Sequence, residues 1–332
     1  MKKIFSIIIP TYNVEDKITK SVKSIINQNH DLYECIIVDG NSDDNTIELV
    51  KKHQNQYPDN IKYISETDQG VYDAMNRGID LAEGEYLYFL GAGDTLKPNI
   101  LTKVKEKLKM KSELVYGGVY LEKTGQVDIA KFDQYRISNR NISHQAIFYH
   151  NSIFRIIGKY NLNYPILADY EFNIRCFSNE KIEKRYLNLV IANYEEEGIS
   201  STVIDKNFIE NKSKILLNFL GATIKDVINK INYNIKGKKI IIWGTSAGYK
   251  DNRNLIKGDI LCFIDSDKNK QGDSLDDKKI YSPDKLFDYN KEDIFIIVFS
   301  KTYYNEISDY LQEKGFKEFK NYCCFVSLMF DN

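Results

Sequence analysis

The stretch from Ser65 to Asp94 constrains the fold more than any other part of the chain. It reads SETDQGVYDAMNRGIDLAEGEYLYFLGAGD, which predicts an acidic loop, a helix over about 72–82, a turn at Gly84 and an apolar strand over 86–90. Asp94 follows that strand in a glycine-rich turn. Because open α/β sheets bind ligands beyond the carboxyl ends of their strands, the sequence predicts an α/β fold with Asp94 in its ligand crevice.

Asp94 also has the chemistry of a metal ligand. A carboxylate oxygen is a hard donor that suits Mg²⁺ or Mn²⁺, and such a cation would in turn hold a diphosphate. Gly91 and Gly93 allow the backbone to approach a ligand closely. We therefore expect Asp94 to bind a divalent cation, Mg²⁺ or Mn²⁺, and Gly93 to lie against the bound ligand.

This stretch resembles the donor-site core of family 2 glycosyltransferases, which are inverting sugar transferases of the GT-A fold. The subgroup that it resembles carries E-x-D-x-G-x-Y-D-A-M-N-x-G and then F-L-x-x-G-D, and works in O-antigen, capsule and related surface polysaccharide assembly. An ordinary amphipathic helix and core strand would not explain the acidic and amide residues at both ends. The matching residues are Glu66, Asp68, Gly70, Tyr72, Asp73, Ala74, Met75, Asn76, Gly78 and Asp94.

The resemblance extends to the ends of the first two predicted strands. A β-branched run over 4–9 predicts a buried strand closed by Pro10, with Thr11 and Tyr12 in the turn that follows. The second strand ends at Asp39 in a segment similar to the family pattern V-D-x-x-S-x-D-x-T. The resemblance implies that the turn lies against the base and ribose of the nucleotide and that Asp39 recognises the base. A simple strand-to-helix turn would explain residues 10–13 equally well.

Two polar residues after Asp39 have a structural interpretation. Ser42 and Asp44 precede a predicted helix over 46–54. Serine and aspartate side chains accept hydrogen bonds from the unpaired amides at helix starts, so we expect both to cap this helix.

Four residues are expected around the diphosphate and the sugar. By resemblance, Asp68, Asp73 and Asn76 shape this region. His144 stands between Ser143 and Gln145 at the start of an apolar strand, where the family often has a histidine. A lone histidine is often structural, but we favour contact with the phosphates or support of the metal side.

The segment over 166–175, ILADYEFNIR, resembles the family helix of the type E-D-x-x-L-x-x-R. In the family this carboxylate is the catalytic base, which makes Asp169 the predicted base and Arg175 the helix arginine. Ala168 replaces the first acid of the pair. Helix initiation would also explain Asp169, because acidic residues stabilise first turns. Glu171 is the second choice for the base.

The remaining parts of the predicted catalytic domain are less informative. The polar segment over 123–141 is expected to be an acceptor-side loop. Three acids over 195–197 would repel a diphosphate, so we expect them to face solvent. The family often ends this domain with G-G-I-S, which residues 198–200 match in part, and this end is a candidate lid. A helical pattern over 205–235 follows as a connector.

The C-terminal part resembles a small Rossmann-like domain. A strand over 239–243 leads into Gly244 and Gly248, and a second strand over 260–264 ends in Asp265, at the place of a ribose carboxylate. The third glycine and a full six-stranded sheet are missing from the pattern. We therefore favour packing, oligomerisation or regulatory ligand binding over dehydrogenase activity for this domain.

Composition bounds the partners and the compartment. The formal net charge is −1, which makes nucleic acid an unlikely partner. Five cysteines without C-x-x-C spacing indicate reduced thiols. No run approaches the roughly eighteen apolar residues of a membrane span. We therefore expect a cytoplasmic protein with at most peripheral contact, at the inner face of the membrane.

These observations predict a GT-A catalytic domain over 1–204, a helical connector over 205–236 and a small Rossmann-like α/β domain over 237–332. The predicted reaction moves a sugar from a nucleotide diphosphate donor, a UDP-sugar by resemblance, to a hydroxyl of a glycan or lipid-linked acceptor. It would serve cell-surface polysaccharide biosynthesis. Two alternatives remain open: an NAD-dependent sugar oxidoreductase or epimerase acting through the C-terminal domain, and a non-catalytic assembly scaffold.

Overall fold

The computed structural model describes residues 3–109, 111–196, 205–256, 258–300 and 303–324. The expected solvent-facing Glu197 and the expected G-I-S segment over 198–200 lie outside these ranges. The chain divides into two compact units, Met1–Leu220 and Gly221–Asn332. All five cysteines are buried, and none of them forms a disulfide bond within the described residues. Among the described helices, none combines the length and the apolar character needed to cross a bilayer.

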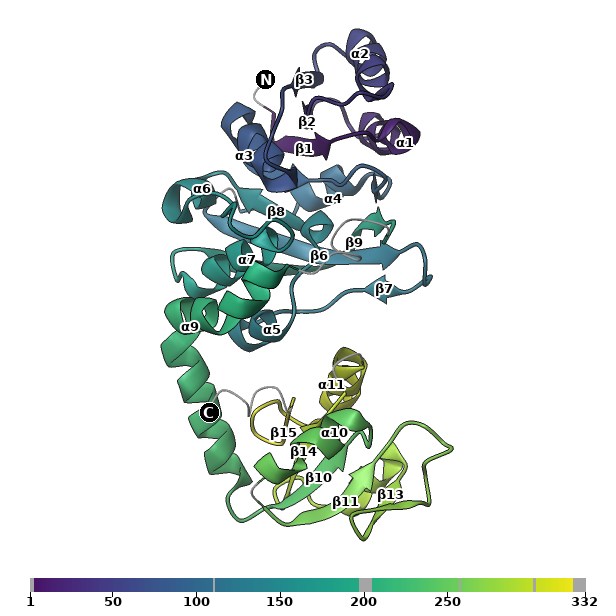
Figure 1. Cartoon of the computed structure of the whole chain (residues 1–332), viewed down its shortest axis with the longest axis vertical. Coiled ribbons are helices and arrows are strands. Elements are labelled where there is room, and N and C mark those ends of the chain that lie inside the picture. Colours follow the sequence, from purple (N-terminus) through teal and green to yellow (C-terminus); the bar gives the residue numbers. More distant parts are fainter. Residues whose placement is uncertain (1–2, 110, 197–204, 257, 301–302, 325–332) are drawn as a thin grey trace. The chain divides into compact units, whose positions relative to one another are not determined.

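The N-terminal unit is built on a mixed sheet, which in the described residues has nine strands (Figure 1). Its order is β3-β2-β1-β4-β8-β6-β9-β5, and β7 pairs with β6. Strands β1, β2, β3 and β4 all run parallel to one another, whereas β8 runs antiparallel to both β4 and β6. The strands are β1 (Phe5–Thr11), β2 (Tyr33–Asp39), β3 (Ile61–Ser65), β4 (Tyr86–Phe89), β5 (Thr95–Leu96), β6 (Glu113–Leu121), β7 (Val127–Asp128), β8 (Ile147–His150) and β9 (Glu183–Tyr194).

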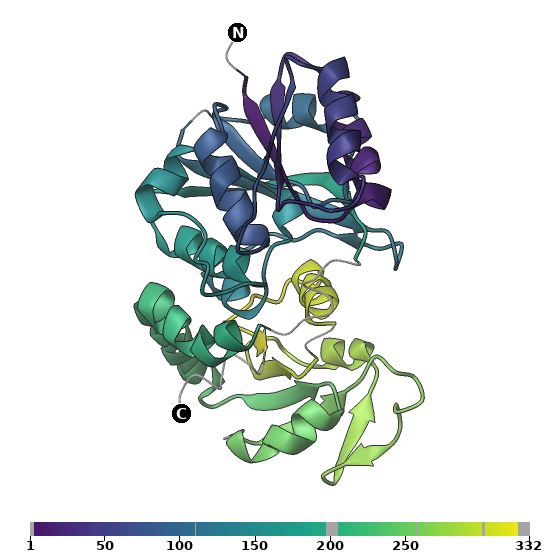
Figure 2. The same ribbon diagram turned by 45° about the horizontal axis from the view of Figure 1, so that its top comes forward.

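Helices cover both faces of the parallel part of this sheet. Ile7 and Ile9 belong to a buried cluster with Ile18 of α1, while Ile8 faces α3, where a Cβ at Gly78 would come 2.4 Å from its Cγ2. Figure 2 shows α1 and α2 on one face and α3 on the other. Burial on both faces explains why β1 is continuously apolar. The helices are α1 (Glu15–Ile26), α2 (Thr46–Gln56), α3 (Val71–Leu81), α4 (Ile100–Lys105), α5 (Gln134–Asn139), η1 (His144–Ala146), α6 (Ser152–Ile157) and α7 (Ala168–Ser178).

Strand β1 continues through Pro10 to Thr11, beyond its predicted end. Ile8 accepts a hydrogen bond from the Leu90 N–H on the β4 side of the strand. Pro10 lies two residues later and therefore faces the same side, where β4 has already ended at Phe89. The missing N–H of proline thus removes no ladder bond, which is the condition for proline within a sheet.

Helix α4 begins at Ile100, directly after Asn99, which adopts a left-handed conformation with φ of 57°. The expected acceptor-side loop contains β7 and α5. Asp133 caps α5 by accepting a hydrogen bond from the Arg136 N–H at 2.7 Å, as aspartate commonly does at helix starts.

The C-terminal unit contains its own sheet, in the order β12-β13-β11-β10-β14-β15. Strands β13, β11, β10, β14 and β15 are parallel, which corresponds to the Rossmann order 3-2-1-4-5. The described sheet has six strands, but β12 is a two-residue strand that pairs antiparallel with β13. The described residues therefore contain five of the six parallel strands of a full Rossmann sheet, in agreement with the pattern in the sequence. The elements are β10 (Lys239–Trp243), α10 (Ala247–Asn252), η2 (Arg253–Leu255), β11 (Ile260–Ile264), β12 (Ser274–Leu275), β13 (Lys278–Tyr281), η3 (Pro283–Asp288), β14 (Ile294–Val298), α11 (Tyr304–Glu313) and β15 (Tyr322–Cys324).

The division between the units lies inside helix α9 (Lys206–Ile235). The start of α9 is bonded to the segment before α7, because Asp205 Oδ2 accepts hydrogen bonds from the Ile166 and Leu167 N–H groups, both at 3.0 Å. Asp205 Oδ1 caps α9 by accepting from the Phe208 N–H at 2.9 Å. The buried Phe208 ring stacks on Tyr170 with 5.0 Å between centroids. The first turns of α9 therefore belong to the N-terminal unit.

Candidate active site

Asp39 lies at the predicted edge of the sheet, but its carboxylate is occupied by protein donors. The strand register aligns Thr11, Asp39 and Ser65 at the carboxyl ends of β1, β2 and β3. Asp39 is fully buried. Its Oδ1 accepts from the Ser42 hydroxyl at 2.5 Å and the Thr11 hydroxyl at 3.2 Å, and its Oδ2 accepts from the Ser65 hydroxyl at 2.7 Å. In this structure Asp39 fastens three strand ends together.

Asp44 caps two helices, whereas Ser42 caps none. Asp44 Oδ1 accepts from the Thr46 N–H at 2.9 Å in the first turn of α2, and its Oδ2 accepts from the Glu15 N–H at 3.0 Å at the start of α1. The prediction for Asp44 is therefore confirmed. The prediction for Ser42 was wrong, because its hydroxyl donates to Asp39 and accepts from the N–H of Asn13, which lies before α1, at 2.9 Å.

Tyr12 and Asp68 are accessible residues of the predicted donor site. Tyr12 follows Thr11 at the end of β1, and 62% of its surface is exposed. Asp68 is half-buried, and its Oδ1 accepts a hydrogen bond from the Gly70 N–H at 2.9 Å. A Cβ at Gly40 would come 2.9 Å from Asp68 Oδ2, so the loop after β2 lies directly against this carboxylate.

Asp73 and Asn76 of α3 are bonded to other parts of the protein. Asp73 Oδ2 accepts from Arg77 Nη2 at 3.0 Å and from the Gln69 N–H at 3.1 Å, which fixes the loop before the helix. Asn76 donates to the Tyr160 carbonyl and accepts from the Tyr160 N–H, both at 3.0 Å. These side chains hold the backbone around the site.

Asp94 is buried where β4 ends. Its Oδ2 accepts from Gln145 Nε2 at 2.6 Å, and its Oδ1 accepts from the Glu195 N–H at 2.9 Å. Burial raises the pKa of Asp94, although both hydrogen bonds and the nearby His144 act to lower it. The charged carboxylate is therefore less well compensated here than in water, which favours the approach of a cation.

Glu195 covers the turn that holds Asp94. Gly93 has φ of 105°, and a Cβ at this position would come 2.0 Å from Glu195 Oε2. The same oxygen pairs with Lys17 Nζ at 3.3 Å. Glu196 is also half-buried and accepts from the Lys123 N–H at 3.0 Å. The expectation that these two acids face solvent was wrong, because backbone bonds and the lysine hold them against the fold.

Asp169 lies in the first turn of α7 and is anchored by three donors. Its Oδ1 accepts from the Tyr72 hydroxyl at 2.9 Å and from the Tyr170 N–H at 2.7 Å. Its Oδ2 accepts from Asn141 Nδ2 at 3.0 Å. His144 Nδ1 is 3.8 Å from the same oxygen. The carboxylate is therefore held in one orientation, with Oδ2 towards His144.

His144 lies between the two acids. It belongs to η1, directly before β8, and the antiparallel register of Tyr88 with Phe148 brings η1 to the edge where β4 ends. His144 interacts electrostatically with Asp94 and lies beside Asp169. Its buried Nε2 has no hydrogen-bond partner among the residues that the structure describes. The fold thus brings together three residues that the sequence singled out far apart in the chain.

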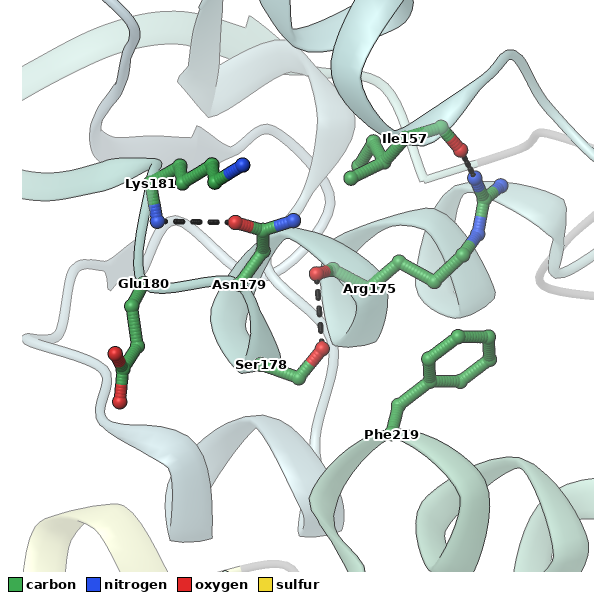
Figure 3. Close-up of a pocket in the computed structure, with 7 residues that line it drawn as sticks. All are labelled: Ile157, Arg175, Ser178, Asn179, Glu180, Lys181 and Phe219. Carbon is green, nitrogen blue, oxygen red and sulfur yellow. Dashed lines mark hydrogen bonds between the residues drawn. The ribbon is translucent and has the colours of Figure 1, made fainter.

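Glu171 and Arg175 are engaged on another side of α7. Arg175 Nη2 pairs with Glu171 Oε2 at 2.8 Å, and the guanidinium also donates to the carbonyls of Ile157 and Lys159. This pairing argues against Glu171 as the base. Figure 3 shows Arg175 at a pocket of about 490 Å³. Arg175 lies in the last turn of α7, whereas Asp169 lies in its first turn. The pocket is lined by Ile157, Arg175, Ser178, Asn179, Glu180, Lys181 and Phe219.

Three residues that hold the acids were not predicted as site residues. Tyr72 and Asn141 bond to Asp169, and Gln145 bonds to Asp94. Tyr72 belongs to the Y-D-A-M-N match and Gln145 stands beside His144, so both had a sequence signal. Asn141 ends the segment that was predicted to be a loop, and nothing in its surroundings marked it.

Asp265 in the C-terminal unit is also occupied by protein donors. It accepts from the Thr245 hydroxyl at 2.5 Å, from the Asp267 N–H at 3.0 Å and from Lys270 Nζ at 3.1 Å. Burial acts to raise the pKa of Asp265, but these hydrogen bonds lower it overall. The position expected to bind a ribose is therefore taken by side chains and backbone of the same unit.

The fold is similar to that of solved glycosyltransferase structures. Residues 1–349 of TarS from S. aureus, in complex with UDP-GlcNAc, align with a TM-score of 0.53 and 20% sequence identity. The alignment covers 67% of this chain and 73% of that structure. Against a longer TarS structure the chain spans 47% of the length, with a TM-score of 0.52.

Relatives with curated names are glycosyltransferases as well. A PGL/p-HBAD biosynthesis glycosyltransferase from Mycobacterium bovis is 44% identical over 212 residues, which are 62% of this chain and 83% of the relative. An uncharacterized glycosyltransferase from Mycobacterium tuberculosis is 30% identical over 205 residues, with coverage of 59% and 76%.

Family models divide the chain in the same way as its two sheets. Residues 236–321 match the model described as C2185-like, N-terminal. Residues 6–181, which contain the acids of the site, match the model described as glycosyl transferase family 2. The chain therefore belongs to glycosyl transferase family 2 and is a glycosyltransferase with a GT-A catalytic unit.

Proposed function

We propose that the chain transfers a sugar with inversion from a UDP-sugar to a hydroxyl of a glycan or lipid-linked acceptor in cell-surface glycan biosynthesis. The observation that carries this proposal is the convergence of two buried carboxylates, Asp94 and Asp169, on His144. The complex of TarS with UDP-GlcNAc supports a UDP-sugar as the donor. The relative named for PGL/p-HBAD biosynthesis supports an acceptor in surface glycan assembly.

Asp169 acts as the general base in this proposal. It accepts the proton of the acceptor hydroxyl while the oxygen attacks the anomeric carbon and the bond to the diphosphate breaks. The hydrogen bonds from Tyr72, Tyr170 and Asn141 keep the carboxylate in place for this step. Attack from the face opposite the leaving group inverts the anomeric configuration.

Asp94 is the proposed ligand of Mg²⁺ or Mn²⁺. The described residues contain no cluster of three or more His, Cys, Asp or Glu side chains that could hold a metal by themselves. A single carboxylate nevertheless suits Mg²⁺, which is commonly bound by one or two carboxylates together with substrate phosphates. The raised pKa of Asp94 agrees with a carboxylate that lacks a positive partner. When bound, the cation would neutralise charge on the leaving diphosphate.

The nucleotide is proposed to lie across the ends of β1 and β2. Tyr12 is exposed and can stack on the base, with Pro10 and Thr11 behind it. Asp39 holds the surrounding loops through Thr11 and Ser65, and it would recognise the base only after exchanging one of these bonds. Asp68 and Gly93 border the diphosphate, and Asp73 and Asn76 keep α3 in position beside the sugar.

A donor panel tests this function. Release of nucleotide is measured from UDP-, GDP-, dTDP- and CDP-sugars with Mg²⁺, with Mn²⁺ and with chelator, for the wild type, Asp94→Asn and the matched strand-end variant Asp265→Asn. We expect metal-dependent release from a UDP-sugar, loss of at least about tenfold in Asp94→Asn, and no change in Asp265→Asn. Release that is equal in all three proteins, or absent with every donor, would contradict the proposal.

A further inference from the structure

We infer that Asn141 is a positioning residue for the Asp169 carboxylate. It is the last member of a chain of hydrogen bonds, called the relay below, that runs from Tyr149 through Asn173 and Asn141 to Asp169. This inference rests on the proposed function, in which Asp169 is the base. It concerns a residue in the segment that the sequence presented as an acceptor-side loop.

The relay has a defined direction. The Tyr149 hydroxyl donates to Asn173 Oδ1 at 2.8 Å, Asn173 Nδ2 donates to Asn141 Oδ1 at 2.8 Å, and Asn141 Nδ2 donates to Asp169 Oδ2 at 3.0 Å. A carboxylate can only accept hydrogen bonds, and each amide has a donor end and an acceptor end. The bond to Asp169 therefore requires both amides to point their NH₂ groups towards the acid.

The members of the relay come from separate elements. Tyr149 lies on β8, Asn173 lies one turn after Asp169 on α7, and Asn141 lies in the segment between α5 and η1. Tyr149 and Asn173 are both fully buried. A polar side chain buried in this way is costly unless it is bonded. The sheet and the helix thus fix the orientation of Asn141, which by itself lies in an irregular segment.

Asn141 decides which part of Asp169 remains available to the acceptor. Oδ1 already accepts from Tyr72 and from the Tyr170 N–H, whereas Asn141 is the protein donor to Oδ2 among the described residues. Oδ2 has the capacity to accept a further hydrogen bond, and His144 Nδ1 lies 3.8 Å from it. We infer that the acceptor hydroxyl gives up its proton at this position.

Titratable side chains from four neighbouring elements lie near Asp169. Tyr72 comes from α3, His144 from η1, Tyr149 from β8 and Tyr160 from the segment after α6. The tyrosines stay neutral near neutral pH, because burial and the Asp169 charge raise the pKa of Tyr72 and Tyr160.

The decisive variant is Asn141→Asp, which keeps the shape of the side chain but replaces its donor by a carboxylate. We expect kcat to fall about ten- to hundredfold, with the donor KM within about twofold of wild type, because a displaced base affects turnover rather than donor binding. The acid limb of the pH-rate profile should move to higher pH, since repulsion makes Asp169 harder to ionise. Tyr149→Phe should show the same changes at about a few-fold.

Tyr116→Phe is the matched control for loss of a buried hydroxyl. The Tyr116 hydroxyl donates to the Phe132 carbonyl at 3.2 Å in the same unit and has no part in the relay. We expect its kcat, donor KM and pH-rate profile to equal those of the wild type. Wild-type kinetics in Asn141→Asp together with an inactive Asp169→Asn would overturn the positioning role and leave the proposed function intact.

A readout without turnover separates the two proposals further. The pKa of Asp169 is measured by NMR with carboxyl-labelled aspartate, and its signal is assigned by its loss in Asp169→Asn. We expect the pKa to be higher in Asn141→Asp than in the wild type and unchanged in Tyr116→Phe. If the wild type released no nucleotide, the proposed function would fail, but an unchanged pKa in Asn141→Asp would still overturn the relay by itself.

Discussion

Each of the two units of the protein has an aspartate at the carboxyl end of a strand in the parallel part of its sheet. Asp39 is the last residue of β2, and Asp265 directly follows β11. In each unit a threonine at or just after the end of the neighbouring strand donates its hydroxyl to the carboxylate, Thr11 in one and Thr245 in the other. Both aspartates are buried and bonded within their own unit. A carboxylate at a strand end therefore does not by itself indicate a ligand site, because in both units it holds neighbouring loops together through hydrogen bonds.

The N-terminal unit differs because other elements bring further polar side chains to the carboxyl ends of its parallel strands. The antiparallel strand β8 brings His144 and Gln145 to Asp94, and helix α7 brings Asp169. The electrostatic result is opposite in the two units, because the pKa of Asp94 is raised by burial while that of Asp265 is lowered by its hydrogen bonds. We therefore expect ligand binding and catalysis at Asp94, where hydrogen bonds do not fully compensate the burial of the charge, and not at Asp265.

The largest difference between the units should come from the predicted base. Asp169→Asn removes proton acceptance but keeps the shape of the side chain, so we expect kcat to fall by about 10² to 10⁴ while nucleotide affinity is retained. Asp265→Asn should leave kcat unchanged. Nucleotide release and calorimetric binding of UDP measure the two quantities. Full turnover in Asp169→Asn would show that another group takes the proton.

A glycine pair tests the importance of the Asp94 turn. Gly93 has φ of 105° and Gly244 has φ of 106°, but a Cβ would meet Glu195 Oε2 at 2.0 Å in the first and its nearest atom at 3.5 Å in the second. Alanine at either position should cost about 1–3 kcal/mol of unfolding free energy through backbone strain. We expect kcat to fall about ten- to hundredfold in Gly93→Ala alone, because Glu195 and the turn must shift. Equal activity of the two variants would contradict this.

The opposite pKa shifts predict opposite responses of stability to pH. Asp265 has a lowered pKa, so its contribution is present above the usual carboxyl pKa of about 4 and is lost as the pH falls through its folded value. We expect Asp265→Asn to destabilise the C-terminal unit by about 1–3 kcal/mol at pH 7 and by less in acid. The fluorescence of the single tryptophan, Trp243, which donates to Ser266 beside Asp265, follows unfolding of this unit.

Asp94 should behave in the other direction. Because its folded pKa is raised, its charge costs stability at pH 7, and this cost disappears as the pH falls and the group becomes protonated. We therefore expect Asp94→Asn to be more stable than the wild type at pH 7, with the two converging in acid. Hydrogen exchange of the β4 amides is the measurement. A variant that is less stable at every pH would show that the hydrogen bonds of Asp94 outweigh its burial.

The smallest expected effect concerns exposed aromatic residues. Tyr12 is 62% exposed in the N-terminal unit and Tyr303 is 59% exposed in the C-terminal unit. Tyr12→Ala should raise the Kd for UDP about threefold to tenfold through lost stacking, without affecting stability. Tyr303→Ala should change neither quantity. Calorimetry with UDP distinguishes them, and an equal Kd in both variants would remove Tyr12 from the nucleotide site.

The sequence predicted regular elements best where burial is uniform. The strands over 239–243 and 260–264 have the predicted bounds, because continuous apolar runs of β-branched residues mark buried parallel strands. The continuation of β1 through Pro10 was not predicted, since it depends on where the neighbouring strand β4 ends. The pattern of residues within one segment does not show where the neighbouring strand of the sheet ends.

For the candidate site, the sequence indicated residue types and strand ends but not partners. Asp94 follows the parallel strand β4, His144 precedes the antiparallel strand β8, and Asp169 stands in the first turn of α7, so each lies at the start or end of an element. The donors that hold them are distant in sequence, since Tyr72 lies 97 positions from Asp169 and Gln145 lies 51 positions from Asp94. Such pairings follow from the assembled fold and cannot be recognised in a segment by itself.

Asp205 determines where this protein can be cut. A fragment that ends at residue 204 would contain every acid of the site, yet the N–H groups of Ile166 and Leu167, just before Asp169, would lose their shared acceptor. It would also lack Phe208 and Leu216, which are buried. Domain boundaries usually fall in exposed linkers, whereas here the seam after Leu220 runs through a helix. Exchange of C-terminal modules between relatives should therefore be made within α9, with its first turns left on the catalytic side.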